Sequence, residues 1–444
     1  MFFFNFYEGI MQPIKIKINN YRAIKSADID FNGVTVVCGD NGSGKSTLSR
    51  LLYYSFKYAN IYDVIVDRKL QRDMGNILSF IHILHYELPK SVTSKVKLPL
   101  LFTENDLFDI SLDSYIQYLY QLYSVLKEGH EKYSDVFLRY KHIIENQIQK
   151  QIWGDEDSDL SFLVKLTADY VVKLKRQAEF DRKERPYNLY EDRLWSATKG
   201  FIDGVSIKEF GTPILEESLT TVRKPTLINK VVYIDTPMIL ELSSIADKLP
   251  VEHWRDTFEL LKSMPSSSRK NIITNSISKD ISQIIGGDAY YSSGLVKGFF
   301  FDSLKSDLQI DIELSASGIK SFSIIKILVD SGMLNRNTLL IIDEPEAHLH
   351  PQWIVEYARI LIQIRKRLGV WMFIASHSTD MVSALRYIAE KQRLLDDVTF
   401  YMTEEDQHET GKYNYKNTGT EIEPQFESFN KSLDKLDEYG SELQ

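Results

Sequence analysis

The sequence predicts an α/β protein with a mixed or parallel sheet and a mainly helical insertion. Helical and strand patterns alternate from about residue 270 to residue 401, which is typical of a parallel sheet with helices on both faces. Near the N-terminus, a strand pattern, a glycine-rich loop and a helical pattern follow one another. Between these two stretches, residues 104–209 have helical spacing and few β-branched runs.

These patterns divide the chain into four expected segments. They are an N-terminal lobe at 11–103, a mainly helical insertion at 104–224, a C-terminal lobe at 225–402 and a polar tail at 403–444. We expect the tail to be a linker with one terminal helix. Met11 directly precedes a strand pattern and is a second candidate start beside Met1.

Composition excludes several classes of protein. A single cysteine rules out an internal disulfide framework and a cysteine-based zinc cluster. The formal net charge of −9 argues against a bulk basic coat, although it allows a local nucleic-acid groove. The apolar run at the N-terminus is too short for a signal peptide or a membrane-spanning helix, so we expect a cytoplasmic protein without a membrane partner.

The first 38 residues contain three predicted strands. Residues 14–18 alternate apolar and basic side chains, the period of a half-buried strand. Residues 27–31 form the second, and Asn32-Gly33 predicts a hairpin turn into the third. Because residues 34–38 are continuously apolar and β-branched, we expect this third strand at the centre of the sheet.

A phosphate-binding loop follows the third strand. Residues 39–46 fit the pattern G-x-x-x-x-G-K-[ST], whose glycines let successive N–H groups turn toward phosphate oxygens. Lys45 is expected to reach the β- and γ-phosphates of ATP, and the Ser46 hydroxyl to bind Mg²⁺. The predicted nucleotide-binding residues are Gly39, Asn41, Gly42, Gly44, Lys45, Ser46 and Thr47. A chance glycine turn is disfavoured, because a buried strand precedes the motif and a helix follows it.

An acidic strand end is the second chemical feature. Residues 339–342 are apolar and run directly into Asp343 and Glu344, which places two carboxylates where parallel sheets bind ligands. Asp343 is expected to hold Mg²⁺, directly or through water, and Glu344 to polarise the water that attacks the γ-phosphate. The alternative is a pair of acids that starts a surface loop.

A histidine ends the next predicted strand, at residues 370–376. His377 could contact the γ-phosphate and sense its loss, and a purely structural histidine is the alternative. His348 and His350 could form a metal pair, but no further ligands accompany them. Cys38 is interpreted as a small buried apolar residue.

In this order, the motifs resemble the ATP-binding-cassette (ABC) ATPase heads of the SMC, RecF and OLD group. The resemblance includes Pro345-Glu346 with Leu349-His350-Pro351, and Ser376-His377-Ser378. It implies a P-loop NTPase fold of the ABC-ATPase type, with Lys45, Glu344 and His377 as catalytic residues. It covers about residues 14–100 and 225–402, and no glutamine-loop residue stands out between 60 and 110.

Residues 314–320 look like a degenerate signature motif of that group. The resemblance implies that this motif contacts the γ-phosphate bound by a second subunit, through Gly318 and either Ser315 or Ser317. It therefore implies a head-to-head homodimer with ATP at the interface. A hydroxyl, glycine N–H groups and a helix start at Ile319 would together favour an anion.

Within that group, the chain looks like ATPase subunits of prokaryotic anti-phage systems of the Septu or PARIS type. The resemblance implies a sensor or scaffold that holds a separate nuclease or toxin, forms a higher homo-oligomer and responds to DNA or a phage protein. An OLD-type nuclease needs a TOPRIM domain, and the stretch after His377 is too short for one. We therefore expect no nuclease domain in this chain.

Two other functions remain open. The first is a DNA-repair ATPase of the RecF or SMC type, and the second is the nucleotide-binding subunit of a transporter. A basic cluster in the helical insertion could bind DNA phosphates or be a solvated face balanced by acids. Its members are Lys173, Lys175, Arg176, Arg182, Lys183 and Arg185.

Overall fold

The computed structural model describes residues 13–99, 108–129, 133–148, 159–200, 202–249, 251–263, 272–294, 296–306, 308–424 and 426. Met1, Met11 and residues 427–444 of the expected tail lie outside the described residues. The chain divides into two compact units. The sheet unit is Met1–Asn60 with Glu191–Gln444, and the helical unit is Ile61–Tyr190.

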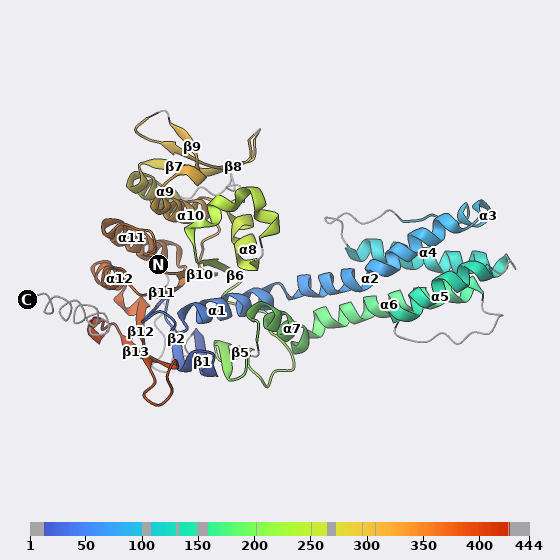
Figure 1. Ribbon diagram of the computed structural model, residues 1–444, viewed down its shortest axis with the longest axis horizontal. Coiled ribbons are helices and arrows are strands. Elements are labelled where there is room, and N and C mark those ends of the chain that lie inside the picture. Colours follow the sequence, from blue (N-terminus) through green and yellow to red (C-terminus); the bar gives the residue numbers. More distant parts are fainter. Residues whose placement is uncertain are drawn as a thin grey trace, which may run out of the picture. The chain divides into compact units, whose positions relative to one another are not determined.

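The sheet unit is organised around a mixed sheet (Figure 1). Ten strands within the described residues form it, in the spatial order β5 (Thr212–Leu215), β4 (Val205–Glu209), β1 (Ile14–Tyr21), β2 (Ile24–Phe31), β13 (Tyr413–Gly419), β12 (Val398–Glu405), β3 (Val34–Cys38), β11 (Trp371–Ser376), β10 (Thr338–Asp343) and β6 (Lys230–Ile234).

Strands β12, β3, β11, β10 and β6 are mutually parallel. Every residue of β3 and of β10 is buried, as expected of strands covered on both faces. The remaining pairs are antiparallel except β13 with β2. Because parallel strands end at one edge of a sheet, β3, β11 and β10 deliver their last residues to the same place.

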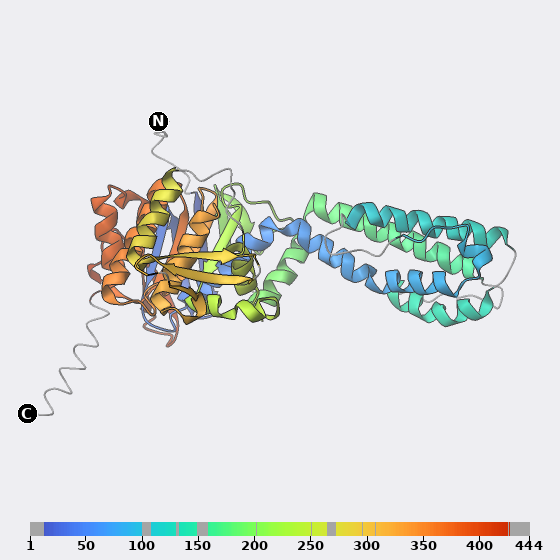
Figure 2. The same ribbon diagram turned by 90° about the horizontal axis from the view of Figure 1, so that it is seen from above.

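Helices cover both faces of the parallel strands (Figures 1 and 2). On one face, alternate residues such as Val36, Ile342 and Ile374 pack into a core shared with α10, α11 and α12. On the other face, α1 brings Ser49 to Asp343. The helices of this unit are α1 (Lys45–Asn60), α8 (Glu252–Leu261), α9 (Ile272–Ile285), α10 (Ser317–Asp330), α11 (Pro351–Leu368) and α12 (Thr379–Lys391), with 3-10 segments at Pro237–Lys248, Ile312–Leu314 and Leu395–Asp397.

A small antiparallel sheet lies beside α9 and α10 (Figure 1). It is formed by β7 (Gly287–Ser292), β8 (Gly298–Ser303) and β9 (Gln309–Asp311). Phe299 and Phe301 point from β8 into the core of the unit. This sheet leads the chain to the start of α10, where the predicted signature residues lie.

The helical unit is a bundle whose longest helices, α2 and α6, pack against each other. Its helices are α2 (Tyr62–Glu87), α3 (Lys90–Thr93), α4 (Phe108–Glu128), α5 (Ser134–Ile148) and α6 (Leu160–Glu184), and α7 (Tyr187–Thr198) continues into the sheet unit. Asp159 caps α6 by accepting a hydrogen bond from the Phe162 N–H. Among the described residues, no helix combines the length and apolar character needed to cross a membrane.

The predicted hairpin at Asn32-Gly33 is wrong. Strand β2 pairs with β1 and β13, whereas β3 pairs with β11 and β12. The hairpin in this region joins β1 to β2, with Tyr21 opposite Ile24. A strand that is buried on both faces is stabilised most in the interior of a sheet, between two parallel neighbours. Strand β3 occupies such a position, and β12 and β13 lie between it and β2.

The predicted segment boundaries also differ from the observed elements. The sequence predicts a linker that includes residues 413–419, but these residues form the interior strand β13. Only Tyr415 of this strand is buried, so its sequence lacks the apolar alternation that predicts a strand. Strands β4 and β5 belong to the main sheet, although the expected helical segment at 104–224 includes them. The helical unit begins at Ile61 and not at residue 104. Helix α2 starts directly after α1 ends, so no loop in the sequence marks this boundary.

Candidate functional site

The phosphate-binding loop connects β3 to α1 at the sheet edge where the parallel strands end. Lys45 is the first residue of α1, and its side chain turns back into the loop. Its Nζ donates hydrogen bonds to the Gly39 carbonyl at 2.7 Å and to the Asp40 carbonyl at 2.8 Å. The ammonium group therefore already lies inside the loop, which is where phosphate oxygens would meet it.

Two glycines of the loop are required by close contacts. A Cβ at Gly39 would lie 1.7 Å from Thr403 Oγ1, and a Cβ at Gly44 would lie 2.8 Å from Ile24 Cγ1. Both residues have positive φ, 151° and 92°. Gly42 has a φ of 86° and no atom within 4 Å of a Cβ placed there, so a ligand can approach the backbone at this point.

The hairpin of β12 and β13 packs against the phosphate-binding loop and supports it. The Tyr415 hydroxyl donates a hydrogen bond to the Ser43 carbonyl at 3.1 Å, and Tyr415 is buried. Thr403 lies directly behind Gly39. This contribution was missed from the sequence, where the only signal is Tyr413 and Tyr415 alternating within a polar stretch.

Asp343 is a buried carboxylate at the end of β10. Its Oδ1 accepts a hydrogen bond from Ser49 at 2.7 Å, and its Oδ2 accepts one from Tyr233 at 2.8 Å. Burial raises the pKa of Asp343, and hydrogen bonds from Ser49, Tyr233 and Ser46 oppose that rise. A carboxylate beside the Ser46 hydroxyl is a set of hard oxygen donors, so these residues fit Mg²⁺.

Glu344 follows immediately in a left-handed conformation, with φ of 47°. Its N–H donates to the Ala375 carbonyl on β11 at 2.8 Å, which fixes the turn against the neighbouring strand. Its side chain remains 42% exposed, so the carboxylate can reach a water molecule at the edge of the site. Such an unfavourable backbone conformation persists only where the surrounding structure holds it.

His377 meets this turn from the end of β11. Its Nδ1 lies 3.5 Å from Glu344 Oε1 and 3.3 Å from Glu346 Oε1. The buried Glu346 Oε1 also accepts hydrogen bonds from the Ser376 hydroxyl at 2.8 Å and the His377 N–H at 2.9 Å. With Nδ1 turned toward the two carboxylates, Nε2 is the nitrogen left for a phosphate. Glu346 was not among the predicted site residues.

Lys45, Asp343 and Glu344 lie close enough for their charges to interact. Burial lowers the pKa of Lys45, and the nearby carboxylates of Glu344 and Asp343 oppose that change. The structure thus brings together the predicted catalytic and metal-binding residues from three stretches of sequence. Nearby, the Ser43 hydroxyl is buried and has no hydrogen-bond partner among the described residues, as expected in a loop built for a ligand.

The predicted signature residues lie at the start of α10. The Ser315 hydroxyl is buried and donates to the Ile312 carbonyl at 2.7 Å. Ser317 is half-buried at the first position of the helix, and Ala316 before it gives no side-chain cap. A Cβ at Gly318 would lie 2.7 Å from the Trp353 ring. Ser317 therefore has the more accessible hydroxyl, while Gly318 has an evident packing role.

The sequence offers no glutamine-loop residue between 60 and 110. Most of residues 60–110 belongs to the helical unit. The strand next to β10 is β6, and the residues after its end are Asp235 and Thr236. The sequence does not mark Asp235 and Thr236 as neighbours of the site, because the long helical insertion separates β6 from the phosphate-binding loop along the chain.

Two of the remaining candidate ligands, His350 and Cys38, have structural roles. His350 caps α11, where its side chain accepts a hydrogen bond from the Gln352 N–H. Burial raises the pKa of the Cys38 thiol, so it behaves as an apolar residue at the end of β3. No group of three His, Cys, Asp or Glu residues suited to a metal ion occurs in the part of the chain that the structure describes.

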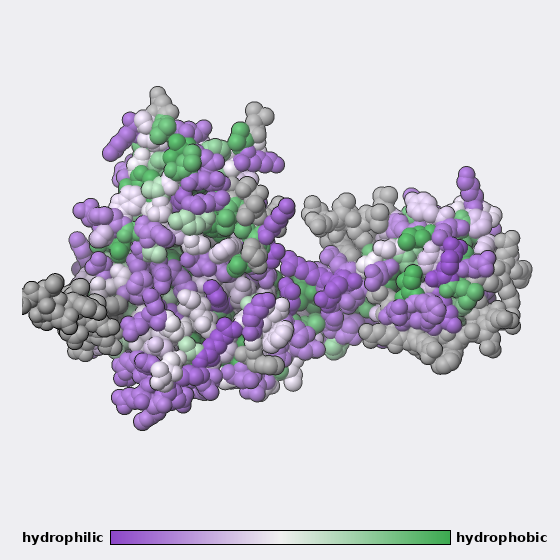
Figure 3. All heavy atoms as spheres, viewed as in Figure 1, coloured by the Kyte–Doolittle hydropathy of each residue, from purple (hydrophilic) through white to green (hydrophobic). Residues whose placement is uncertain are grey.

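The basic cluster of the helical unit is largely paired. Lys175 lies 2.6 Å from Asp113, Arg182 forms an ion pair with Asp67 at 2.5 Å, and Arg185 lies 3.5 Å from Asp63. Lys183 lies 3.6 Å from Glu184. Hydrophilic side chains cover the visible face where α2 and α6 run together (Figure 3). These pairs favour the solvated face over a phosphate-binding stripe.

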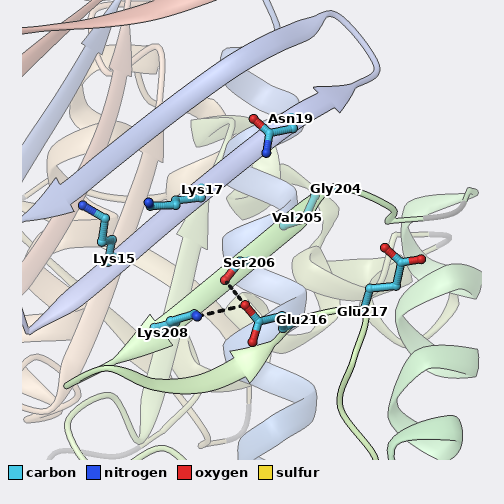
Figure 4. Close-up of a pocket in the computed structure, with 9 residues that line it drawn as sticks. All are labelled: Lys15, Lys17, Asn19, Gly204, Val205, Ser206, Lys208, Glu216 and Glu217. Atoms are coloured by element: carbon cyan, nitrogen blue, oxygen red, sulfur yellow. Dashed lines mark hydrogen bonds and ion pairs between the residues drawn. The ribbon is translucent and has the colours of Figure 1, made fainter.

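A cavity of about 500 Å³ lies on the polar face of β1 and β4, away from the loop (Figure 4). Its basic side chains are Lys15, Lys17 and Lys208. Lys15 pairs with Asp28 and Asp30, and Lys208 pairs with Glu216 at 2.9 Å. Because Lys15 and Lys208 are already paired with acidic side chains, we interpret this cavity as a solvent-filled hollow on the sheet face and not as a ligand-binding site.

Residues 11–199 match the family model described as the AAA ATPase domain. The match contains the phosphate-binding loop, which the structure places at the end of a central parallel strand. The chain has a P-loop ATPase fold. The matched residues stop before β10 and β11, so the roles of Asp343, Glu344 and His377 rest on their motifs and on the geometry above.

The Old nuclease of Escherichia phage P2 is 23% identical to this P-loop ATPase over 286 residues, covering 53% of this chain and 47% of that protein. The chain thus matches about half the length of this relative. The family match and this relative are both compatible with the resemblance that the motifs indicate.

Solved structures show a distant likeness. The SMC head of Pyrococcus furiosus bound to the C-terminal domain of ScpA is 10% identical, with 96% of this chain and 98% of that chain covered and a TM-score of 0.34. The SMC head domain of Thermotoga maritima is 9% identical, with 91% and 98% covered and a TM-score of 0.34. CbiO1 of Clostridium perfringens, part of an ABC transporter complex, is 12% identical, with 97% and 99% covered and a TM-score of 0.32.

The support that β13 gives to the loop predicts a specific effect on nucleotide affinity. Tyr415→Phe removes the hydrogen bond to Ser43 and should weaken ATP binding about five-fold, the equivalent of one neutral hydrogen bond. Tyr401→Phe is a matched control, because its hydroxyl binds Asp30 away from the loop. Fluorescent-nucleotide titration measures both variants. Equal affinities would show that the hairpin does not support the loop.

Proposed function

We propose that this chain binds and hydrolyses ATP, and that it is the sensor and scaffold subunit of an anti-phage complex that holds a separate nuclease and releases or activates it. The observation that supports the ATPase activity is the meeting of Lys45, Asp343, Glu344 and His377 at one sheet edge. A phosphate-binding loop alone can bind nucleotide, but hydrolysis also needs a positioned water molecule and groups that stabilise the negative charge on the transferred phosphoryl group.

Hydrolysis follows from the positions of these groups. Loop N–H groups and the Lys45 ammonium bind the β- and γ-phosphates, in place of the Gly39 and Asp40 carbonyls that Lys45 now contacts. Glu344 accepts a proton from water while the water oxygen bonds to the γ-phosphorus. The bond from the γ-phosphorus to the β,γ-bridging oxygen breaks, which leaves ADP and phosphate.

Ser46 and Asp343 would hold Mg²⁺, which neutralises charge on the β- and γ-phosphates when it is bound. His377 Nε2 would contact the γ-phosphate, and its Nδ1 stays with Glu344 and Glu346. Loss of the γ-phosphate would remove one contact from a histidine that otherwise touches only the acidic turn. This is the part of the site that can distinguish ATP from ADP.

A second copy of the chain would complete the site. The first turn of α10 has free N–H groups and the accessible Ser317, which together favour an anion. Leu314, just before it, is 80% exposed, although large apolar side chains usually gain from cover. Both features support a head-to-head homodimer with ATP between the loop of one subunit and α10 of the other.

The proposed role in defence extends from the likeness to the Old nuclease of a phage. A defence ATPase of the Septu or PARIS type would transmit ATP state to a separate effector and form a higher homo-oligomer. The alternative, a repair ATPase that binds DNA directly, has less support because the basic cluster on α6 is paired with acids. DNA or a phage protein remains the proposed trigger.

Glu344→Gln should lower ATP turnover about 100-fold or more, because the variant cannot accept the proton from water. ATP binding should persist, since the side chain keeps its size and one of its two acceptor oxygens. Lys45→Ala should instead abolish binding. Glu217→Gln is the control, an exposed acid outside the site. Phosphate release and nucleotide titration measure both properties. Unchanged turnover in Glu344→Gln would remove Glu344 from its role.

Mixing two inactive variants tests the shared site. Lys45→Ala and Ser317→Arg should each be inactive, but random pairing should restore about a quarter of wild-type turnover, because each heterodimer has one intact site. Ser317 is preferred to Gly318, where any side chain would meet Trp353. Mixing Lys45→Ala with Asp343→Asn is the control, since both defects lie in the same half-site and nothing should recover. No recovery in the first mixture would contradict a shared site.

The effector can be sought in the gene beside this one. Co-expressed with the product of that gene, the tagged chain should retain a nuclease or toxin, and Lys45→Ala should change the amount retained. Size-exclusion chromatography with mass measurement gives the stoichiometry. Metal-dependent DNA cleavage by the purified chain, unaffected by substitution of Lys45 or Glu344, would contradict a separate effector.

A further inference from the structure

Besides Ser46, which would share the metal ion, two hydroxyls from different elements hold Asp343 before any ligand arrives. Ser49 on α1 donates to one carboxylate oxygen, and Tyr233 on β6 donates to the other. Tyr233 is 1% exposed. A carboxylate has about four lone-pair positions, so two hydrogen bonds fix its direction and still leave positions for a metal ion or its water.

The ring of Tyr233 is itself held from α8. The His253 ring lies 4.5 Å from it, centre to centre, and the Thr257 hydroxyl donates to the Tyr233 carbonyl at 3.0 Å. His253 is buried and its Nε2 lies 2.8 Å from Asp235 Oδ2. The Trp254 Nε1 donates to the other oxygen of Asp235 at 2.7 Å. Thr257, His253 and Trp254 of α8 thus each have a polar contact with Tyr233 or with Asp235, and the Arg50 guanidinium also interacts with Tyr233.

Helix α8 is in turn fastened to α1, the helix that starts at Lys45. Lys57 Nζ lies 2.7 Å from Glu252 Oε1, and the Tyr58 hydroxyl donates to Glu252 Oε2 at 2.6 Å. Tyr53 and Lys57 also bind Asp256. Because α8 is anchored to both α1 and β6, the two hydroxyls that hold Asp343 keep a fixed separation.

Hydrolysis as derived above uses none of these α8 contacts. Apolar side chains of similar shape would fill this place with little loss of stability, because even a satisfied buried hydrogen bond contributes little net stability. Groups that orient a metal-binding carboxylate, however, strongly affect metal affinity. The network therefore has a functional explanation at the end of the site where the metal would bind.

We propose that Tyr233 is a positioning residue for Asp343, and that the Asp235–His253 pair holds its ring so that the carboxylate faces the metal–nucleotide complex in advance. The inference rests on the proposed ATP site and adds a determinant of its metal dependence. Tyr233 acts through Asp343 and touches neither nucleotide nor water. The sequence gives no hint of it, since a tyrosine in a strand normally indicates only a buried aromatic side chain.

The test compares Tyr233 with a tyrosine outside this network, in the full-length chain. Tyr233→Phe should raise the Mg²⁺ concentration for half-maximal binding of a fluorescent ATP analogue about ten-fold, as is typical when a group that orients a metal ligand is lost. Its affinity for the analogue in EDTA should be unchanged. Tyr401→Phe is the matched control, because its hydroxyl accepts hydrogen bonds from Asp30 and Asn417, outside the contacts that hold Asp343. Mn²⁺ binding followed by electron paramagnetic resonance gives a second readout.

A double-mutant cycle keeps the result decisive. If Tyr233 acts through Asp343, Tyr233→Phe should have no further effect on metal dependence in an Asp343→Ala background. Equal behaviour of Tyr233→Phe and Tyr401→Phe, or an equal loss of binding with and without metal, would overturn the inference as a merely structural effect. A wild-type chain that binds no nucleotide with Mg²⁺ would instead overturn the proposed function.

Discussion

The parallel pairing of β3, β11 and β10 is the constraint on which the site depends. These strands are buried on both faces, so their apolar sequences select adjacent interior positions, and parallel direction then brings Cys38, Ser376 and Asp343 to one edge. The phosphate-binding loop, His377 and the adjacent carboxylates of Asp343 and Glu344 meet at this edge, although these three stretches lie far apart in sequence. The hydrogen bond from Ser49 to Asp343 ties α1 to this edge.

Much of the site could be predicted because its residues follow strongly apolar strands. Gly39, Lys45, Asp343, Glu344 and His377 each lie at or just beyond such a strand, which gives both the residue and its place. Supporting groups could not be found in this way. Glu346, Tyr233 and Tyr415 act through contacts between elements distant in the chain, and no local pattern marks those contacts.

The fold was predicted less well where the strands are polar or where a turn signal competes with sheet order. Strand β13 buries only Tyr415, so its sequence is typical of a loop although it lies inside the sheet. Asn32-Gly33 has the composition of a hairpin turn, yet the all-buried β3 must leave β2 to find parallel partners. In both cases tertiary pairing outweighs the local preference of the chain.

A structure of the chain with a non-hydrolysable ATP analogue and Mg²⁺ tests the central claim most directly. The account predicts a γ-phosphate between Lys45 and Glu344, with the metal ion on Ser46 and Asp343 and His377 facing the phosphate. A saturated sample in which this edge stays empty, or in which the nucleotide binds at another place, would contradict the account.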